Sequence, residues 1–194
     1  MKNLTNNIFQ VLVATLLVFT LSNCGDDEPV EPPHEEELIT TLKVLFTAAD
    51  GSGGSATMSY YDEDGDDGPL SPVITGGILK SNMEYSVYVQ LLNESETPAE
   101  DVTEEIEEED KEHQFFFQVS NGLDLIHSYK DKDDDNNPVG VVNEFNTGAA
   151  STGTLTVVLR HEPDKSASGV SAGDITNAGG ETDIEVTFDV VIAD

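Results

Sequence analysis

Two acidic loops carry aspartates at alternate positions, a spacing that suits the binding of a hard cation. The first loop contributes Asp62, Asp64 and Asp66, and the second contributes Asp131, Asp133 and Asp135. Calcium takes about six to eight oxygen ligands, and carboxylates at every second position of a tight turn can converge on one ion. Neither loop matches an EF-hand, because its sixth position holds Asp67 or Asn136 where that motif needs glycine. Two interpretations follow: calcium is a cofactor, or both loops are only solvated connections between strands.

Three of the four histidines share the alternation of the apolar residues around them, which places them on strands. Glu112 precedes His113, Glu162 follows His161, and His127 lies between them in the chain. Imidazole nitrogens and carboxylate oxygens are ligands that zinc and copper accept in proteins. The sequence therefore suggests the hypothesis of a transition-metal site that includes His113 or His161 together with nearby glutamates.

A hairpin expected between two of these strands limits how many histidines can meet. Asn121-Gly122 is typical of a two-residue turn, and pairing across it puts His113 and His127 on opposite faces of a sheet. A site of three histidines is therefore disfavoured. A smaller site stays open, alongside the simpler interpretation that these histidines lie partly exposed at strand ends.

The single cysteine, Cys24, follows an apolar run over residues 8–21 that begins soon after Lys2. This run is shorter than the roughly 20 apolar residues that a membrane-spanning helix needs, and it fits the apolar region of a secretory signal. Leu21-Ser22-Asn23-Cys24 resembles the lipobox of bacterial lipoproteins, in which the cysteine is lipidated and becomes the new N-terminus. We therefore expect a signal peptide over residues 1–23. The alternative is an uncleaved anchor with an incidental cysteine.

An acidic, proline-rich segment over residues 24–37 follows the signal and reads as an extended tether. Residues 38–194 remain for a single folded domain. The formal charge of the whole chain is −31, and it becomes −32 when Lys2 leaves with the signal. Such a charge argues against a nucleic-acid partner and favours cations or basic partners.

Period-two alternation of apolar residues over most of the domain predicts a mostly β protein. We expect eight or nine strands in an antiparallel β-sandwich of the Ig-like or Greek-key kind. The expected strands cover residues 38–47, 56–60, 73–79, 83–91, 115–119, 123–129, 139–145, 155–161 and 184–192. The run over residues 73–79 is interrupted by Gly76-Gly77.

One segment departs from the strand pattern. Thr97-Pro98-Ala99-Glu100 matches a capping box with proline in the first helical position, which predicts an inserted acidic α-helix near residues 98–112. Val102 and Ile106 would dock this helix, since they lie one turn apart. A long connection over residues 162–180 is expected to hold a short helical turn near residues 172–177.

With these residues in hand, the chain resembles a group of small outer-membrane lipoproteins of Bacteroidota. The pieces that carry the resemblance are LSNC with its acidic tail, ELITTL, YDEDGDDG, LLNESETPAEDVTEEIEEE, EHQFFF, LRHEPDK and GDITNAGGETDIEV. Some members carry a type 1 periplasmic-binding fold name, but that fold needs repeated strand–helix units, so the sequence favours the sandwich. The resemblance implies a lipid-anchored protein of the outer membrane, exposed on the cell surface, with a TonB-dependent receptor as its partner.

Three classes of function are compatible with these patterns. The leading interpretation is a non-catalytic binding or accessory module for an outer-membrane uptake system, with a divalent cation as a candidate ligand. The second is a structural or adhesion module stabilised by calcium. The third is a carbohydrate-acting enzyme, which the sequence supports least because it contains no nucleophile elbow or metalloprotease helix motif, so no catalytic residues are expected.

Overall fold

The computed structural model describes residues 38–51, 54–63 and 68–194, and these belong to one compact unit. The expected signal peptide, the tether, Cys24, Asp64 and Asp66 lie outside the described residues. Within the described part, no helix has the length and apolar character needed to cross a bilayer.

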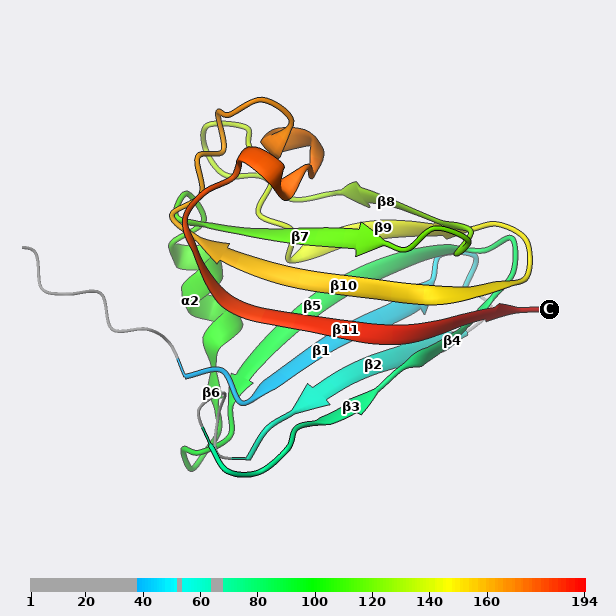
Figure 1. The fold of residues 1–194 in the computed structure, drawn as a ribbon, viewed down its shortest axis with the longest axis horizontal. Coiled ribbons are helices and arrows are strands. Elements are labelled where there is room, and N and C mark those ends of the chain that lie inside the picture. The colour runs from blue at the N-terminus through cyan, green and yellow to red at the C-terminus, as the bar shows by residue number, and fades with distance from the viewer. Residues whose placement is uncertain (1–37, 52–53, 64–67) are drawn as a thin grey trace, which may run out of the picture. The chain divides into compact units, whose positions relative to one another are not determined.

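Two sheets face each other in this unit, and Figure 1 shows them as two layers. The first sheet has the order β3-β2-β1-β5-β9-β8, with the short β6 paired to β5. Its strands are β1 (Thr41–Ala48), β2 (Ser55–Tyr61), β3 (Val73–Thr75), β5 (Glu84–Asn93), β6 (Glu100–Asp101), β8 (Leu125–Tyr129) and β9 (Val142–Thr147). Every neighbouring pair in this sheet is antiparallel.

The second sheet has four strands in the order β4-β11-β10-β7. Its strands are β4 (Gly77–Lys80), β7 (His113–Val119), β10 (Ser151–His161) and β11 (Glu181–Ala193). The pairs β7–β10 and β10–β11 are antiparallel, whereas β4 runs parallel to the end of β11. The predicted mostly β fold, an antiparallel sandwich with one helix, is therefore confirmed.

The expected strand over residues 73–79 divides between the two sheets. β3 pairs with β2 in the first sheet, and β4 pairs with β11 in the second. The chain changes sheets at Gly76, whose backbone packs so tightly that an added Cβ would collide with the carbonyl oxygen of Asp189. Glycine is therefore required there by close backbone approach.

The hairpin predicted at Asn121-Gly122 is wrong as a strand pairing, although the turn itself forms. Gly122 has a φ of 102°, and the amide of Leu123 donates to the carbonyl of Ser120 at 3.3 Å. β7 pairs with β10 and β8 pairs with β9, so the strands on either side of the turn enter different sheets. The turn signal was correct locally, but packing between the layers determined the pairing.

The helix is shorter than predicted and starts later. α2 covers Val102–Glu108, and Asp101 caps it by accepting the amide of Thr103. Pro98 follows a cis peptide bond, and Glu100–Asp101 form β6, so the predicted capping box does not start the helix. Val102 and Ile106 are buried as expected.

The main core fills the space between the inner faces of the sheets. Phe46, Phe115, Phe145 and Phe188 are fully buried in it. A second cluster lies on the other face of β7 and β10, where Phe116 and Val158 pack against Val170 and Ala178 of the connection over residues 162–180. This connection holds two short 3-10 turns, Val170–Ala172 and Ile175–Asn177, in agreement with the expected helical turn.

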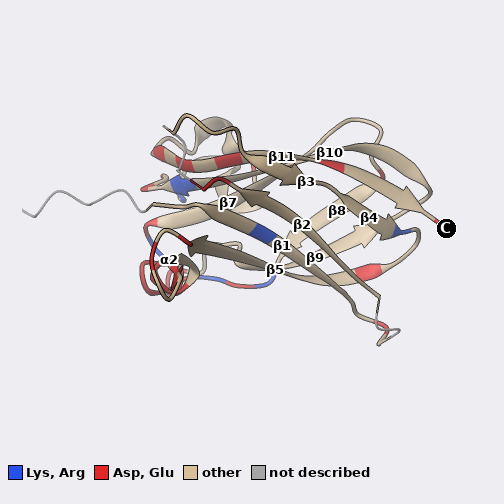
Figure 2. Cartoon of the chain, turned by 90° about the horizontal axis from the view of Figure 1, so that it is seen from below, with Lys and Arg blue, Asp and Glu red and all other residues tan. Residues whose placement is uncertain are grey.

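Acidic residues gather around α2 and at the neighbouring end of the second sheet, as Figure 2 shows. The end of α2, the start of β7 and the end of β10 meet here, because Glu109 contacts His113 and the amide of Glu162 donates to the carbonyl of Glu112 at 2.6 Å. The sandwich therefore brings several chain segments together at one strongly acidic rim.

Candidate metal centre

The structure brings His113 and His161 together. They are Cα partners in the antiparallel β7–β10 pair, and their rings stack with centroids 4.7 Å apart and planes 13° apart. Directly opposed residues on antiparallel strands project from the same face, and here it is the face of Phe115 and Leu159. The two histidines thus extend the inner face of the second sheet to its rim.

His113 is nearly inaccessible to solvent and electrically neutral. Its Nδ1 lies 3.2 Å from the backbone oxygen of Glu109, which indicates that Nδ1 carries the proton and donates. Burial lowers the pKa of His113 to about 4, and it outweighs the hydrogen bond to the backbone oxygen of Glu109, which raises that pKa. Its Nε2 lies 4.0 Å from Oδ2 of Asp183, and this approach is not an ion pair because the ring is neutral.

The potential ligand atoms that converge belong to Glu112, His161 and Glu162. One ligand atom from each lies within 4.8 Å of the others, and Nε2 of His161 is 3.9 Å from Oε2 of Glu112. Ligands of one zinc ion lie about 4 Å apart at most, since each bond is about 2.1 Å long. The three side chains therefore need to close by less than about 1 Å to hold an ion.

Glu112 carries the clearest sign of a missing partner. Its Oε2 is buried and accepts no hydrogen bond from the described residues. Buried acceptors are almost always satisfied, and an exception calls for an explanation such as a bound ion. The unsatisfied Oε2 makes Glu112 a candidate metal ligand, and its side chain as a whole is 44% exposed.

Glu162 holds an uncommon backbone conformation directly after β10. Its φ is 49°, in the left-handed region that residues with a Cβ rarely enter. Such strain is found most often at functional sites, where the rest of the fold imposes it. Here the short hydrogen bond from its amide to the backbone oxygen of Glu112 fixes the conformation, and the carboxylates of both glutamates lie near His161.

The stacked arrangement decides which histidine can bind. Imidazole nitrogens bind metals in the plane of the ring, so parallel rings direct their lone pairs side by side and not toward one point. His113 does not belong to the converging group, whereas His161 does. Of the two predicted ligands, His161 therefore faces the carboxylates, and His113 supports its ring.

The second acidic loop has partners for all three predicted calcium ligands. Asp131 accepts the amides of Gly140 and Val142 at 2.8 and 2.7 Å, and Asp135 forms an ion pair with Lys111 at 3.3 Å. Asp133 accepts the amides of Asp135 and Asn137 through Oδ1, and its Oδ2 pairs with Lys165 at 3.1 Å. Burial raises the pKa of Asp133, but these hydrogen bonds and the lysine outweigh it and lower that pKa overall. Calcium binding here would have to displace these contacts.

The first acidic loop is described only in part. Asp62 is buried and accepts the hydroxyl of Tyr60 at 3.2 Å, while Asp64 and Asp66 lie outside the described residues. Calcium binding by either loop stays a prediction.

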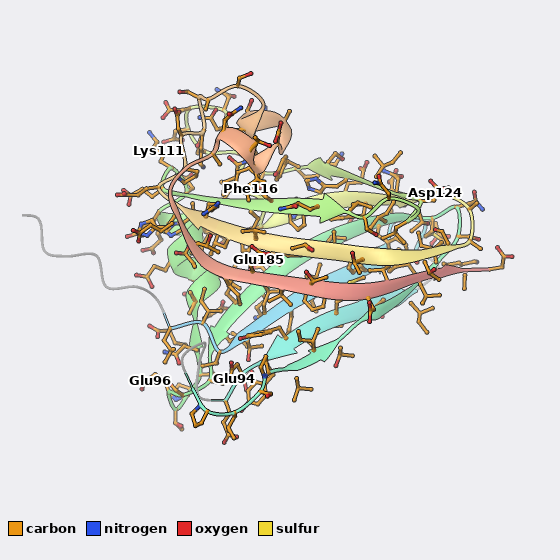
Figure 3. The ribbon with its side chains drawn as sticks, viewed as in Figure 1. Glu94, Glu96, Lys111, Phe116, Asp124 and Glu185 are labelled. Carbon is orange, nitrogen blue, oxygen red and sulfur yellow. The ribbon has the colours of Figure 1, made fainter. Side chains whose placement is uncertain are left out.

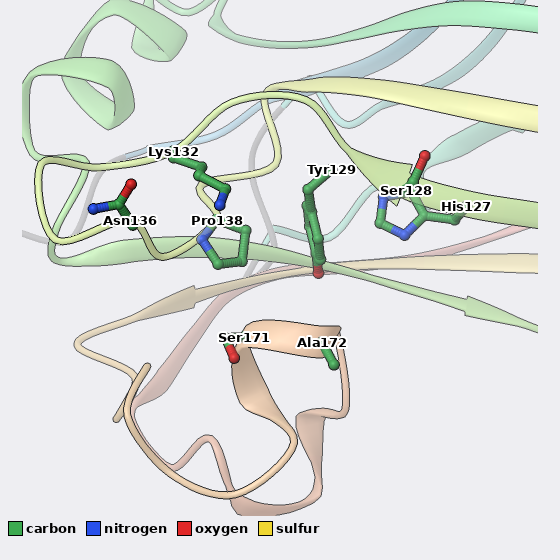
Figure 4. A pocket seen from close by; sticks show the side chains of 8 residues that line it. All are labelled: His127, Ser128, Tyr129, Lys132, Asn136, Pro138, Ser171 and Ala172. Carbon is green, nitrogen blue, oxygen red and sulfur yellow. The ribbon is translucent and has the colours of Figure 1, made fainter.

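His127 lies apart from the other two histidines, on β8 of the first sheet. Its ring is 4.4 Å from that of Phe117, and its Nε2 is 2.9 Å from Oδ1 of Asn143. Together with Tyr129 and Ser171 it lines a cavity of about 420 Å³ between β8 and the connection over residues 162–180 (Figure 4). This cavity contains none of the converging ligands, and β8 with His127 belongs to a different sheet from β7 with His113 and β10 with His161.

Sequence reasoning had no signal for two neighbours of the centre. Lys165 lies in a polar loop and reads as exposed, yet it is buried. Asp183 lies at a shift in the β10–β11 register, because Leu159 pairs with Ile184 and Arg160 with Thr182. This bulge turns Asp183 toward His113, and no feature of the local sequence predicts the bulge.

Comparisons of the whole chain with family models, with curated proteins and with solved structures each give no match. The function must therefore be argued from the residues themselves.

Proposed function

We propose that the chain is a non-catalytic, lipid-anchored binding module of the outer membrane that holds a divalent transition-metal ion, with zinc as the best fit. The observation that carries the metal assignment is the buried Oε2 of Glu112, which has no hydrogen bond and faces Nε2 of His161. Glu162 supplies the third ligand.

The chemistry of the ligand set favours zinc over calcium at this position. One imidazole and two carboxylates leave a fourth position for water or for a donor from a partner, as in zinc sites with three protein ligands. Calcium prefers six or more oxygens and does not normally take imidazole. An open position also suits a module that receives or hands over its ion.

We assign the module no catalytic role because its neighbouring groups are already engaged. His113 uses Nδ1 on Glu109 and stacks on His161, and Lys165 is held in an ion pair with Asp133. A general base needs a free lone pair near a substrate-sized space. The calcium-stabilised structural module remains the second candidate. The metal titration described below distinguishes it from the transition-metal module.

The membrane part of the proposal rests on Cys24 and its lipobox. Lipidation of Cys24 would anchor the domain through the acidic tether, and the resemblance supports a role as an accessory to a TonB-dependent receptor. Incorporation of labelled palmitate into the wild-type chain, and its loss in Cys24→Ala, would test the anchor. Protease treatment of intact cells tests the face, because a periplasmic domain would be protected.

The metal test uses the chain from residue 24 onward with Cys24→Ser, stripped of metal and titrated with zinc, manganese and calcium by calorimetry. We expect binding of one zinc ion per chain and a rise in the thermal midpoint, since a ligand that binds only the folded state stabilises it. Glu112→Gln and His161→Gln should each abolish zinc binding.

Glu107→Gln is the matched control, because Glu107 is exposed on α2, shortly before Glu112 in the chain, and lies outside the ligand group. It removes the same charge as Glu112→Gln and should leave zinc affinity unchanged. Equal losses of zinc affinity in Glu107→Gln and Glu112→Gln would show that zinc responds only to the overall negative charge of the protein. A response to calcium that survives Glu112→Gln would support the structural module in place of the transition-metal site.

A further inference from the structure

One edge of β11 is unpaired over its middle. β10 pairs with it along almost its whole length, from Glu181 to Ile192, whereas β4 covers only Val190–Ala193 on the other side. No described strand pairs with that other side between Ile184 and Phe188. The free stretch is bounded by the bulge at Asp183 and by the close approach of Gly76 to Asp189.

The backbone groups that face this free edge can be identified. The amide of Ser120 donates to the carbonyl of Thr154, and the amide of Thr154 donates to the hydroxyl of Ser120, so Thr154 directs its backbone groups away from β11. Its partner Asp189 therefore directs its own groups away from β10. By alternation along the strand, Glu185 and Thr187 also present N–H and C=O to the free edge.

A groove of about 440 Å³ lies along this edge, between β11 and the outermost strand of the first sheet. Its apolar lining includes Tyr60, Ile74, Ile184 and Val186. Ile74 is the register partner of the buried Tyr60, so both face the interior, yet Ile74 remains 48% exposed. The sandwich is therefore open on this side, where an added strand would cover Ile74.

Charge decides what can fill the groove. Its charged lining residues are Asp183 and Glu185, and none of the residues that line it is basic. Figure 3 shows Glu185 on β11. A second copy of β11 would place like charges opposite each other, which destabilises strand pairing, and the acidic tether would be repelled in the same way. A strand with lysine or arginine on its outer face would gain cross-strand ion pairs.

We propose that the free edge of β11 binds an extended, cationic segment of a partner protein by strand addition. The segment forms backbone hydrogen bonds with Glu185 and Thr187, buries apolar side chains at alternate positions over Ile74 and Val186, and pairs its basic side chains with Glu185. Main-chain bonds supply affinity in this mode, and alternating side chains supply specificity. The metal centre is not required.

The test measures binding of a synthetic peptide in which lysine and valine alternate, capped at both ends, to the chain from residue 24 onward with Cys24→Ser. Fluorescence anisotropy at physiological ionic strength screens long-range attraction between a cation and this acidic protein. We expect saturable binding to the alternating peptide. Two control peptides should each bind at least about tenfold more weakly. One has the same composition with its lysines grouped at one end, and the other alternates but has N-methylated amides.

Thr187→Pro removes the amide that faces the free edge and no bond to β10, and proline is tolerated on edge strands for that reason. It should weaken binding of the alternating peptide by about tenfold while leaving the charge of the protein unchanged. Thr156→Ala is the control, because it also removes the 2.8 Å contact between the hydroxyls of Thr156 and Thr187 but leaves the edge intact. Glu185→Lys should shift the preference toward an alternating glutamate–valine peptide.

Three results would overturn the proposal. Equal binding of the alternating and grouped peptides would reduce the effect to net charge. Dimerisation of the free protein that Thr187→Pro abolishes would identify a second copy as the occupant. A gain in peptide affinity on deletion of residues 25–35 would identify the tether as the occupant. The N-methylated peptide keeps the proposal falsifiable even where Thr187→Pro does not fold.

Discussion

The ammonium of Lys165 lies 3.1 Å from Oδ2 of Asp133, and the side chains are 5% and 1% exposed. Lys165 also donates to the backbone oxygen of Asp110, just after α2. One side chain thereby ties together the connection over residues 162–180, the second acidic loop and the helix end. Burial lowers the pKa of Lys165, and its ion pair with Asp133 partly offsets that effect.

Lys165→Met should destabilise the fold by about 3 kcal/mol, because it leaves the carboxylate of Asp133 buried without its cation. Urea denaturation measures the change. The double variant Lys165→Met/Asp133→Asn should cost clearly less than the sum of the single variants, since it removes both charges and retains Oδ1 as an acceptor. Simple additivity would contradict a coupled pair.

His113 makes stability depend on pH in a defined window. Its pKa falls from 6.5 to about 4 on folding, so the unfolded chain binds more protons between these values. The free energy of unfolding therefore has its full value, as far as His113 is concerned, above pH 6.5. It falls as the pH drops toward 4, by up to roughly 3 kcal/mol. Asp133, whose pKa is also lowered, acts below its unfolded value of 3.8 and so outside this window.

Urea titrations in chelator across that window, on the wild type and on His113→Phe, would measure the effect. The variant keeps an aromatic ring against His161 but cannot titrate, so its stability should depend less steeply on pH. A residual slope is expected from His127, because burial lowers its pKa too. Identical slopes in the two proteins would exclude His113 as the source.

The strands could be predicted from the sequence because each one shows alternating apolar residues in its own local sequence, as in Ile184, Val186 and Phe188 of β11. Their pairing could not, since the β7–β10 register depends on packing between segments that are far apart in the chain. The adjacency of His113 and His161 is a consequence of that register. The pairs Glu112-His113 and His161-Glu162 were therefore visible as candidates but not as one site.

The helix start illustrates how a strong local motif can lose to tertiary pairing. Asp101→Ala should destabilise the fold by about 1 kcal/mol, because Asp101 caps α2 through the amide of Thr103. Thr97→Ala should change the free energy of unfolding by less than about 0.5 kcal/mol, since the predicted cap is not used. Thermal denaturation of both variants would show which residue caps the helix. A larger loss of stability in Thr97→Ala than in Asp101→Ala would support the predicted capping box.

Gly76→Ala should destabilise by about 2 kcal/mol or more, because its Cβ would meet a backbone carbonyl that cannot move aside without disturbing β11. Gly179→Ala is the comparison. Gly179 has a φ of 61° but open space around its Cα, so the change there carries only backbone strain of about 1 kcal/mol. A smaller loss at Gly76 than at Gly179 would contradict the tight crossing between the sheets.

Glu162 should show opposite effects on stability and on metal binding. Glu162→Gly relieves the left-handed backbone and should stabilise the metal-free protein by about 1 kcal/mol or less, since the greater flexibility of glycine offsets part of the relief. It should also abolish zinc binding, because the third ligand is lost. Glu162→Gln removes the carboxylate charge but keeps the strain, so it should lose zinc without any gain in stability. Chemical denaturation with and without zinc measures both effects. If Glu162→Gly retained full zinc affinity, Glu162 would not be a ligand of the ion.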